Sequence, residues 1–467
     1  MRKIDDEIQA LLSEHRGDIR SILKDNHRLD LLYALSSQRE LLLEWYDFEP
    51  EAEVLQVGAD YGALTGLLRS SVSAVTVLDE TESALETVRQ RYPGAANIYY
   101  RKDSLAGYAA EACAEGKKYD YVIFAGTLTA PYEKHIHAAK SLLKPDGILI
   151  VALANALGMK YFAGTVEEEN ALTKRQLAEL LCGDKETQSM ADESGTLKFY
   201  YPMPDYKTPV SIYSDAYLPK KGDLTRVTPA YDYPPYHLME QGEKFDTVCE
   251  AGLFDLYANS YLVFWSADPK QLQKDDERIF IKYNKTRREE FQIKTCICER
   301  NVIGAAGASG AAGADATGNS AAGKKERYVE KAALSLDGSA HIASFKEKYE
   351  KLTKQHRTLK VAEPKFAEHR NSVFFPYLVG ETCAEKLGEQ LEGGQLPLDV
   401  LQIVMNQIYD ISPECRSAFV RTADFDEVFG ADLTEEEQNL LLSDTACEVS
   451  NIDALFENML MTREGIY

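Results

Sequence analysis

A glycine turn followed by an acidic residue is the part of this chain best suited to hold a ligand. Gly58 and Gly62 lie in a turn between an apolar run at 54–57 and a helix-prone segment at 63–68. Free backbone N–H groups at the start of a helix favour a polar or anionic group. Asp79 ends the next apolar run, roughly twenty residues after Gly58, where a carboxylate can accept both hydroxyls of a ribose. The pattern predicts a site for a nucleotide-like cofactor.

Apolar runs and helix-like segments continue to alternate after this first unit. Strands are expected at 98–103, 119–126 and 147–153, with helices at 83–92 and 133–143. This order predicts an α/β fold with a doubly wound, Rossmann-like parallel sheet. Because ligands bind beyond the carboxyl ends of such strands, four residues should surround one crevice, namely Gly58, Asp79, Asp103 and Gly126.

From about residue 35 to residue 268, the chain resembles class I S-adenosylmethionine-dependent methyltransferases. The similarity is greatest to those found with bacterial surface-polysaccharide and glycan clusters, and four phrases carry it, at 35–46, 141–147, 157–164 and 199–206. The resemblance implies a seven-stranded sheet with 197–203 and 261–266 as its last strands. It also implies S-adenosylmethionine as cofactor and a sugar or glycan intermediate as acceptor. The implied cofactor-binding residues are Gln56, Gly58, Asp60, Gly62, Asp79, Asp103 and Gly126.

Four departures from the family pattern fall at this one site. Gln56 stands where relatives carry an acid that contacts the methionine amino group, and Asp60 replaces the middle glycine, near the cofactor carboxylate. Ala-Asn-Ala at 154–156 replaces Glu-Asn-Arg, and the acceptor loop at 165–170 lacks its histidine. These changes predict weak cofactor affinity or a decayed site. The alternative is therefore a non-catalytic scaffold or partner subunit in glycan biosynthesis.

A nicotinamide-dependent oxidoreductase is a third hypothesis. It fits the first βαβ unit but neither the Lys-Pro-Asp-Gly phrase at 144–147 nor the Phe-Ala-Gly phrase at 162–164. The sequence assigns no catalytic base for a methyl transfer.

Composition bounds the function further. The 467 residues suffice for two domains, and 75 acidic against 52 basic residues give a formal charge of −23. This charge argues against nucleic acid or an anionic membrane as partner. We find no apolar run long enough to span a bilayer and no signal-peptide core, so a cytoplasmic protein is expected. Cys296 and Cys298 would share one strand face as buried small hydrophobes, and no metal site is predicted.

Residues 1–34 are expected to form a helical lead-in, and 35–268 the methyltransferase-like domain. Ile4, Ile8, Leu11 and Leu12 have helical spacing, which favours a helix packed on the next domain over a partner-binding arm. The stretch 205–257 is rich in tyrosine and proline. Two interpretations stay open for it: an acceptor-binding lid that stacks on sugar rings, and an insertion held by its own aromatic residues.

Residues 269–467 are expected to form a second, α+β domain. Strands are predicted at 278–283, 290–299, 327–334, 360–361 and 372–377, with a helix at 340–353 and a flexible Gly/Ala-rich insertion at 304–323.

This order resembles the small lobe of protein kinases and aminoglycoside phosphotransferases. The resemblance implies a phosphate-pairing role for Lys331 and an adenine-holding hinge at 374–378. Asp453 and Asn458 have the spacing of a kinase catalytic loop, in which the Asp orients a hydroxyl and the Asn binds magnesium, but no His-Arg precedes Asp453. A methyltransferase–kinase-like bifunctional fragment is therefore a further alternative.

Overall fold

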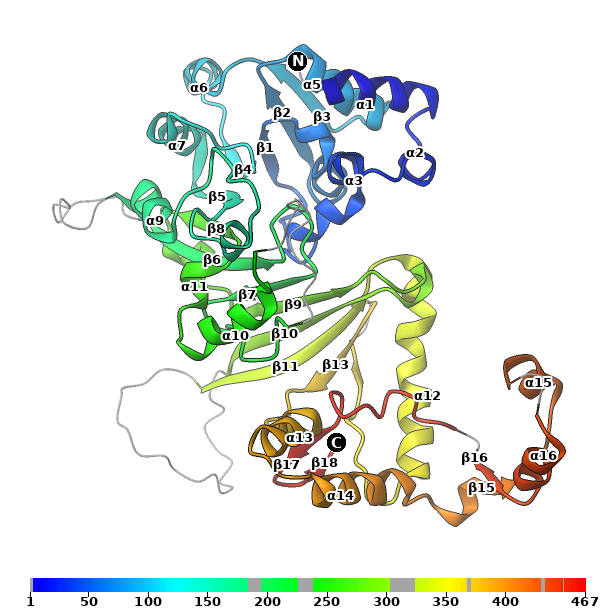
Figure 1. Ribbon diagram of the computed structural model, residues 1–467. Helices are drawn as coiled ribbons and strands as arrows, with labels where there is room; N and C mark the ends of the chain where they lie inside the picture. Colours follow the sequence, from blue (N-terminus) through cyan, green and yellow to red (C-terminus); the bar gives the residue numbers. More distant parts are fainter. Residues whose placement is uncertain are drawn as a thin grey trace. The chain divides into compact units, whose positions relative to one another are not determined.

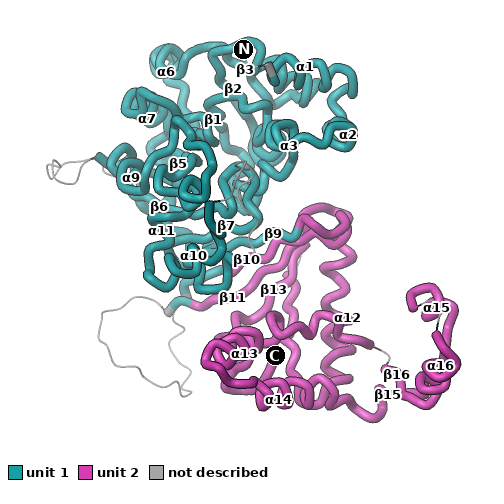
Figure 2. Tube along the Cα trace, viewed as in Figure 1, with its two compact units in different colours: residues 1–284, 298–325 teal, residues 285–297, 326–467 magenta. Residues whose placement is uncertain are grey.

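The computed structural model divides the chain into two compact units (Figure 2). Unit 1 comprises Met1–Asn284 and Cys298–Lys325, and unit 2 comprises Lys285–Ile297 and Glu326–Tyr467. The residues described are 3–183, 195–225, 238–302, 324–367, 371–429, 433–447 and 449–467. The Gly/Ala-rich insertion predicted at 304–323 lies outside them.

Unit 1 is built on a sheet in which the strand order is β9-β7-β6-β8-β5-β4-β1-β2-β3 (Figure 1). Strands β1 to β5 pair in parallel, and β8 lies antiparallel between β5 and β6. This order confirms the expected Rossmann-like sheet, and β7 and β9 extend the seven expected strands on the β6 side. The strands are β1 (Glu53–Val57), β2 (Ala74–Asp79), β3 (Ile98–Lys102), β4 (Tyr119–Ala125), β5 (Leu143–Ala154), β6 (Thr196–Met203), β7 (Ser211–Ser214), β8 (Ser260–Ser266) and β9 (Asp276–Asn284).

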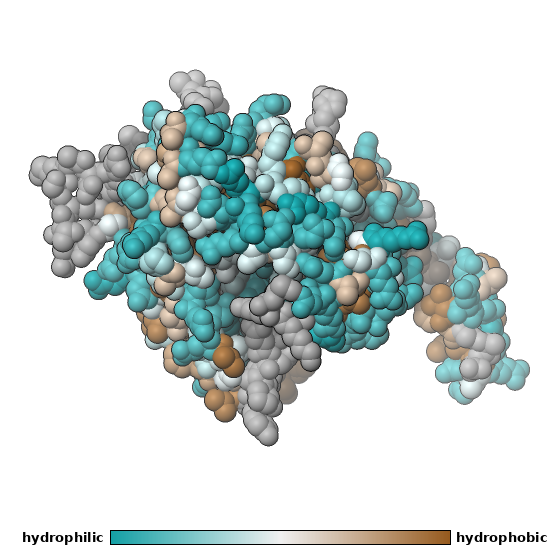
Figure 3. Space-filling model, turned by 90° about the horizontal axis from the view of Figure 1, so that it is seen from above, coloured by the Kyte–Doolittle hydropathy of each residue, from teal (hydrophilic) through white to brown (hydrophobic). Residues whose placement is uncertain are grey.

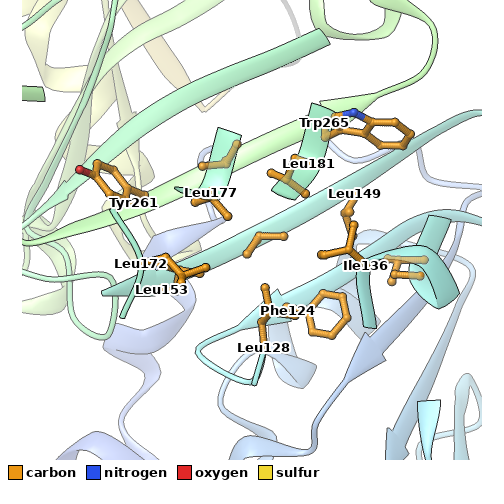
Figure 4. Packing of buried hydrophobic residues seen from close by; sticks show 14 of the residues in the cluster. Phe124, Leu128, Ile136, Leu149, Leu153, Leu172, Leu177, Leu181, Tyr261 and Trp265 are labelled. Carbon is orange, nitrogen blue, oxygen red and sulfur yellow. The ribbon is translucent and has the colours of Figure 1, made fainter. Parts of the chain in front are cut away.

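Helices cover both faces of this sheet, with α6 beside α7 and α5 beside α1 (Figure 1). The central strands are buried nearly throughout, as strands covered on two faces must be. Figure 4 shows part of their core, in which Phe124, Leu149 and Tyr261 from the sheet meet Ile136 and Leu177 from the helices. The helices are α4 (Thr65–Ser71), α5 (Glu82–Arg91), α6 (Leu105–Ala114), α7 (Tyr132–Ser141), α8 (Met159–Phe162), α9 (Lys174–Cys182), α10 (Gln241–Glu250) and α11 (Phe254–Tyr257), with 3₁₀ turns at Asp60–Gly62 and Pro269–Leu272.

The N-terminal segment packs on unit 1, as its helical spacing predicts. Ile8 and Leu12 are buried with Ile22 and Leu31 in a small separate core. The Gln9 amide donates to the Ser83 carbonyl oxygen at 2.7 Å and so ties this segment to α5. The segment forms α1 (Lys3–Glu14), α2 (Ile19–Asp25), α3 (Leu29–Leu35) and a 3₁₀ turn at Ser37–Leu42.

The face of the molecule seen in Figure 3 is mostly hydrophilic, with apolar side chains scattered singly. In the described part of the chain, no helix has the length and apolar character needed to cross a membrane.

Unit 2 contains a sheet in the order β12-β13-β11-β10 and a long helix, α12. The strand predicted at 360–361 is wrong: Lys360 lies in an extended connection whose N–H donates to Ile466 O, and the edge strand forms later, at β12. The elements are β10 (Ile293–Val302), β11 (Lys324–Ala333), α12 (Ser339–Gln355), β12 (Lys365–Phe366), β13 (Ser372–Pro376), β14 (Glu381–Thr382), α13 (Cys383–Glu392), α14 (Leu398–Tyr409), β15 (Arg416–Ala418), α15 (Ala423–Phe429), α16 (Glu435–Leu442), β16 (Thr445–Cys447), β17 (Leu460–Thr462) and β18 (Gly465–Ile466), with 3₁₀ turns at Glu289–Phe291, Leu336–Gly338 and Pro413–Cys415.

Candidate functional site

The acid at the end of β2 holds the glycine turn in place. One Asp79 carboxylate oxygen accepts the Ala59 N–H at 2.9 Å, and the other accepts both the N–H and the hydroxyl of Thr81 at 2.9 Å. A carboxylate has about four acceptor positions, so these three bonds leave room for one more. Binding both hydroxyls of a ribose here would require the Thr81 hydroxyl to turn away.

Gln56 is an internal part of the same turn. Its side chain is buried, and its amide nitrogen donates to the carbonyl oxygens of Gly58 and Ala59 at 3.1 and 3.3 Å. Its amide oxygen accepts the Thr65 hydroxyl at 2.8 Å. Both amide protons are therefore directed at the protein's own backbone.

Little space is left above the turn. Gly58 has a φ of +86°, and a Cβ added there would lie 2.5 Å from Cγ2 of Thr127, the residue that follows β4 by two positions. The void between Gln56, Gly58, Leu64 and Thr127 measures about 10 Å³, which is no larger than a single water requires. In this geometry the turn itself accommodates no cofactor group.

A much larger cleft adjoins the turn at the carboxyl ends of β1 and β4. It measures about 400 Å³ and is lined by Arg39, Asp60, Gly126, Glu168, Tyr206 and Lys207. Gly126 has a φ of +79°, and a Cβ there would meet the Tyr206 hydroxyl at 2.6 Å, so only glycine lets this tyrosine approach the strand end. The volume falls within the range of small-molecule sites, at the sheet edge where such folds bind ligands.

Asp60 lies on this cleft but does not present an unpaired charge. Its carboxylate accepts a bond from the Arg39 guanidinium at 2.6 Å, and Arg39 is buried, with a second bond to Tyr33 O. Burial lowers the pKa of Arg39, but the charge and hydrogen bond of Asp60, together with Tyr206 and Asp205, outweigh it and raise that pKa above its ordinary value. Because Arg39 neutralises the charge of Asp60, the predicted repulsion between Asp60 and a cofactor carboxylate should be weaker than for an unpaired aspartate.

A second charged group closes the opposite side of the cleft. Lys160 on α8 has no exposed side-chain surface, and its Nζ lies 2.6 Å from an Asp205 oxygen and 2.9 Å from a Glu168 oxygen. Glu168 also accepts bonds from the Tyr206 hydroxyl and the Lys207 ammonium, each at 3.1 Å. The loops at 165–170 and 203–207 are thus tied together by one buried lysine.

These neighbours fix the protonation states of the cleft. Burial raises the pKa of Glu168, but Lys160 and then Lys207 outweigh it and hold that pKa at about 2. Burial, with Glu168 and Asp205 nearby, raises the pKa of Tyr206 well above its ordinary value. At neutral pH, Glu168 is a weakly basic carboxylate and Tyr206 a neutral phenol, so neither is suited to remove a proton from an alcohol.

Of the four residues predicted to surround one crevice, Gly126 lines the cleft and Gly58 the small void beside it, whereas Asp79 and Asp103 line neither. Asp103 accepts a bond from the Ser104 N–H at 2.8 Å, at the start of α6. The sequence interpretation assigned no site role to the other charged residues in and beside the cleft. Four of them lie in or beside family-like phrases that the sequence analysis had already singled out, namely Arg39, Lys160, Asp205 and Lys207.

Part of the tyrosine-rich stretch belongs to the core. Tyr206 and Tyr213 are buried, and Tyr213 packs against Phe254 and Phe280 with ring centroids 5.9 and 4.9 Å apart. Three further tyrosines of the proposed lid lie outside the described residues, namely Tyr231, Tyr233 and Tyr236.

The candidate residues of unit 2 lie in one region. Burial lowers the pKa of Lys331, while the charge of Asp453 acts in the opposite direction. Lys331 Nζ is 5.7 and 5.8 Å from the ring centroids of Phe345 and Phe375. The Asn458 amide donates to the backbone carbonyl of Asp453 at 3.1 Å. Over the described residues, no group of three or more His, Cys, Asp or Glu is arranged to hold a metal ion.

Comparisons with known proteins concern structure alone, since no protein-family model and no curated protein matches the sequence. Solved structures that resemble the chain include several methyltransferases. One is a complex of the Haloferax volcanii Trm112 methyltransferase activator with a methyltransferase, at 14% identity over 57% of this chain and 97% of that one, with a TM-score of 0.32.

Two others contain S-adenosylhomocysteine. Haemonchus contortus phosphoethanolamine N-methyltransferase 1 is 13% identical over 56% of this chain and 48% of its own, with a TM-score of 0.31. The N-methyltransferase NodS from Bradyrhizobium japonicum is 19% identical over 31% and 71%, with a TM-score of 0.23.

Proposed function

We propose that this chain is an S-adenosylmethionine-dependent methyltransferase whose acceptor is a sugar or glycan intermediate. The observation that carries the proposal is the cleft of about 400 Å³ at the carboxyl ends of β1 and β4, beside the glycine turn. Ligands of doubly wound sheets bind at this edge, and the volume suits a small molecule. The cofactor-binding residues proposed are Gln56, Gly58, Asp60, Gly62, Asp79, Asp103 and Gly126.

The residues present fit the cofactor in part. Arg39, buried at the cleft wall, is a cation already paired with Asp60, and Gly126 faces the Tyr206 hydroxyl. The turn and Asp79 would have to rearrange, since Thr127 fills the space beside Gly58 and the Thr81 hydroxyl is bonded to Asp79. When bound, the cofactor supplies an electrophilic methyl group on a sulfonium.

This chain's own residues would orient the acceptor and exclude water. Glu168, Asn170 and Lys207 offer hydrogen-bond acceptors and donors on one wall, which suits a hydroxyl-rich molecule. Lys160 holds the loops that carry them. Because Glu168 is a weak base, its proposed part is to accept a bond from an acceptor hydroxyl, with proton loss to water after the transfer.

A methyl-transfer assay tests this proposal. S-adenosylmethionine with a labelled methyl group would be incubated with the intact chain and nucleotide-sugar or lipid-linked glycan acceptors. We expect label in an acceptor, and at least about a hundredfold less with Arg39→Met/Asp60→Asn, which removes both charges at the cleft wall together. Lys134→Met, on the surface of α7, is the matched control. Absence of transfer with every acceptor would contradict the proposal.

A non-catalytic scaffold is the second candidate, and the void of about 10 Å³ over the turn favours it. In this case a former cofactor site is filled and stabilised by the side chains of Gln56, Asp79 and Thr127. The two candidates differ in one property: a scaffold has no measurable affinity for S-adenosylmethionine, whereas a methyltransferase with slow chemistry still binds it.

For unit 2 we propose a kinase-like fold without assigning it phosphotransfer. Two strands, β10 and β11, precede α12 in unit 2, and β12 and β13 follow it, whereas the small lobe was expected to have three strands before its helix. The strand predicted at 278–283 forms β9 of unit 1, and Lys331 lies on β11. Its neighbours include two phenylalanine rings. Calorimetric titration with Mg·ATP tests whether any nucleotide site exists, and we expect binding weaker than about 1 mM.

A further inference from the structure

Two consecutive residues of the glycine turn have a backbone conformation that favours glycine, although neither is a glycine. The φ angles are +39° at Asp60 and +54° at Tyr61, in the left-handed region, where a Cβ crowds the backbone. Within 58–62, the glycines that avoid this crowding are Gly58 and Gly62. The pair at 60–61 therefore keeps its conformation only because the surrounding structure holds it there.

The N-terminal segment, residues 3–42, contacts both side chains of this pair. The Tyr61 hydroxyl donates to an Asp5 carboxylate oxygen on α1 at 2.7 Å, and the Tyr61 ring packs against the small apolar core that α1, α2 and α3 form. The Asp60 carboxylate pairs with Arg39 of the same segment at 2.6 Å. The two residues in the left-handed region are thus both bonded to the N-terminal segment.

A second arginine holds the backbone of the pair. Arg91, at the end of α5, donates to Tyr61 O at 3.0 Å and to Leu35 O at 2.8 Å, so it joins the turn to the end of α3. The first half of the turn is held differently, since Gln56 donates to Gly58 O and Asp79 accepts from Ala59. The contacts of the N-terminal segment are therefore made with the second half of the turn.

The conformation of this pair affects ligand access because Asp60 borders two spaces. It lines both the void of about 10 Å³ above the turn and the cleft of about 400 Å³ beside it. Rotation of Asp60 and Tyr61 to negative φ would relieve the crowding of their Cβ atoms and would move the wall that the two spaces share. A ligand that needs the rearranged turn binds more weakly as long as contacts to the N-terminal segment have to be broken first.

We propose that the N-terminal segment makes an autoinhibitory contact with the glycine turn, through Tyr61 and Asp5, that keeps S-adenosylmethionine out of the turn. This inference rests on the proposed function, because it takes that cofactor as the ligand. Release of Tyr61 from Asp5 lets the turn adopt the rearranged conformation that the cofactor requires. Tyr61 lines neither the cleft nor the void, so its substitution acts on affinity through the conformation of the turn.

Matched variants of the full chain test this contact. Asp5→Ala removes the acceptor of the Tyr61 hydroxyl, and Tyr61→Phe removes the donor. Asp6→Ala is the control, because it removes an exposed carboxylate from the next position of α1 with the same change of charge. Hydrogen exchange without ligand reports on the turn through the amides at 59–63, several of which donate hydrogen bonds there. We expect these amides to exchange about tenfold faster in Asp5→Ala and Tyr61→Phe, and at the parent's rate in Asp6→Ala.

Affinity for S-adenosylmethionine, measured by calorimetry, is the second measurement. Asp5→Ala and Tyr61→Phe should bind the cofactor about three- to tenfold more tightly than the parent, whereas Asp6→Ala should bind it as the parent does. Unchanged exchange in Asp5→Ala and Tyr61→Phe, or equal or weaker binding by them, would overturn the autoinhibitory contact and leave the proposed function standing. Absence of binding by the parent and by every variant would overturn the proposed function and this inference with it.

Discussion

The glycine turn and the neighbouring cleft lie at the same edge of one sheet, and both include Asp60 and Ala125, yet they differ in what occupies them. Side chains of Gln56 and Thr127 fill the space over the turn, which is reduced to about 10 Å³. Two charged groups, Arg39 with Asp60 and Lys160 with Asp205 and Glu168, line a space of about 400 Å³.

The difference shows that polar and charged residues at the carboxyl end of a sheet can either fill the space there or line an open cleft. Over the turn, the Gln56 amide donates to backbone carbonyls and the Ala59 N–H donates to Asp79, so these donors are already used within the protein. At the cleft, Lys160 pairs with Asp205 and Glu168 and ties together the loops that carry them. The proposed function depends on the open cleft and not on the filled turn.

The largest effect is expected from removing the buried lysine of the cleft. Lys160→Met leaves Asp205 and Glu168 without the cation that offsets their burial, and it should lower the free energy of unfolding by about 3–5 kcal/mol. Urea denaturation measures the loss. Lys207→Met removes a partly exposed lysine from the same carboxylate and should cost about 1 kcal/mol or less. Equal effects of the two would show that Lys160 does not hold the cleft.

Acid should destabilise the cleft through Glu168. Its folded-state pKa of about 2 lies below its ordinary value of 4.5, so its contribution is present above pH 4.5 and is lost as the pH falls toward 2. The shift corresponds to about 3 kcal/mol. Unfolding free energies of the parent and of Glu168→Gln, measured from pH 6 to 2, should approach each other as the pH falls. Parallel curves would contradict the depressed pKa.

A smaller loss is expected at the turn. Asp79→Ala leaves the buried Ala59 N–H without its acceptor and should cost about 1–3 kcal/mol of stability. The same change should weaken S-adenosylmethionine binding by about 1–3 kcal/mol if the ribose reaches Asp79. Glu80→Ala, on the exposed neighbour, is the control. A stability loss with unchanged affinity would assign Asp79 to the turn and remove it from the site.

The smallest effect is expected from opening the turn. Thr127→Ser deletes the methyl group that faces Gly58 and should cost about 1 kcal/mol or less. If a cofactor must displace this side chain, the variant should bind it more tightly than the parent, by calorimetry. Weaker or equal binding would indicate that ligands enter only the cleft.

Sequence patterns predicted the sheet of unit 1 because buried parallel strands are apolar runs separated by turns and helices, as at 119–126 and 147–153. They located Gly58, Asp79 and Gly126 at one edge for the same reason. They could not foresee that Gln56 and Asp79 satisfy the turn itself, since a hydrogen-bond partner is not visible in spacing. The Lys160–Glu168 and Arg39–Asp60 ion pairs could not be predicted, because each joins residues of different elements. The short strand at 365–366 could not be predicted either, because it depends on pairing with β13.

Calorimetric titration of the intact chain with S-adenosylmethionine, S-adenosylhomocysteine and NADH tests the central claim most directly. We predict that both S-adenosyl compounds bind, NADH does not, and Gln56→Glu/Asp60→Gly tightens the binding by restoring an ammonium partner and freeing Arg39. Failure of both the parent and that double variant to bind at about 1 mM S-adenosylmethionine would contradict the methyltransferase proposal and leave the scaffold.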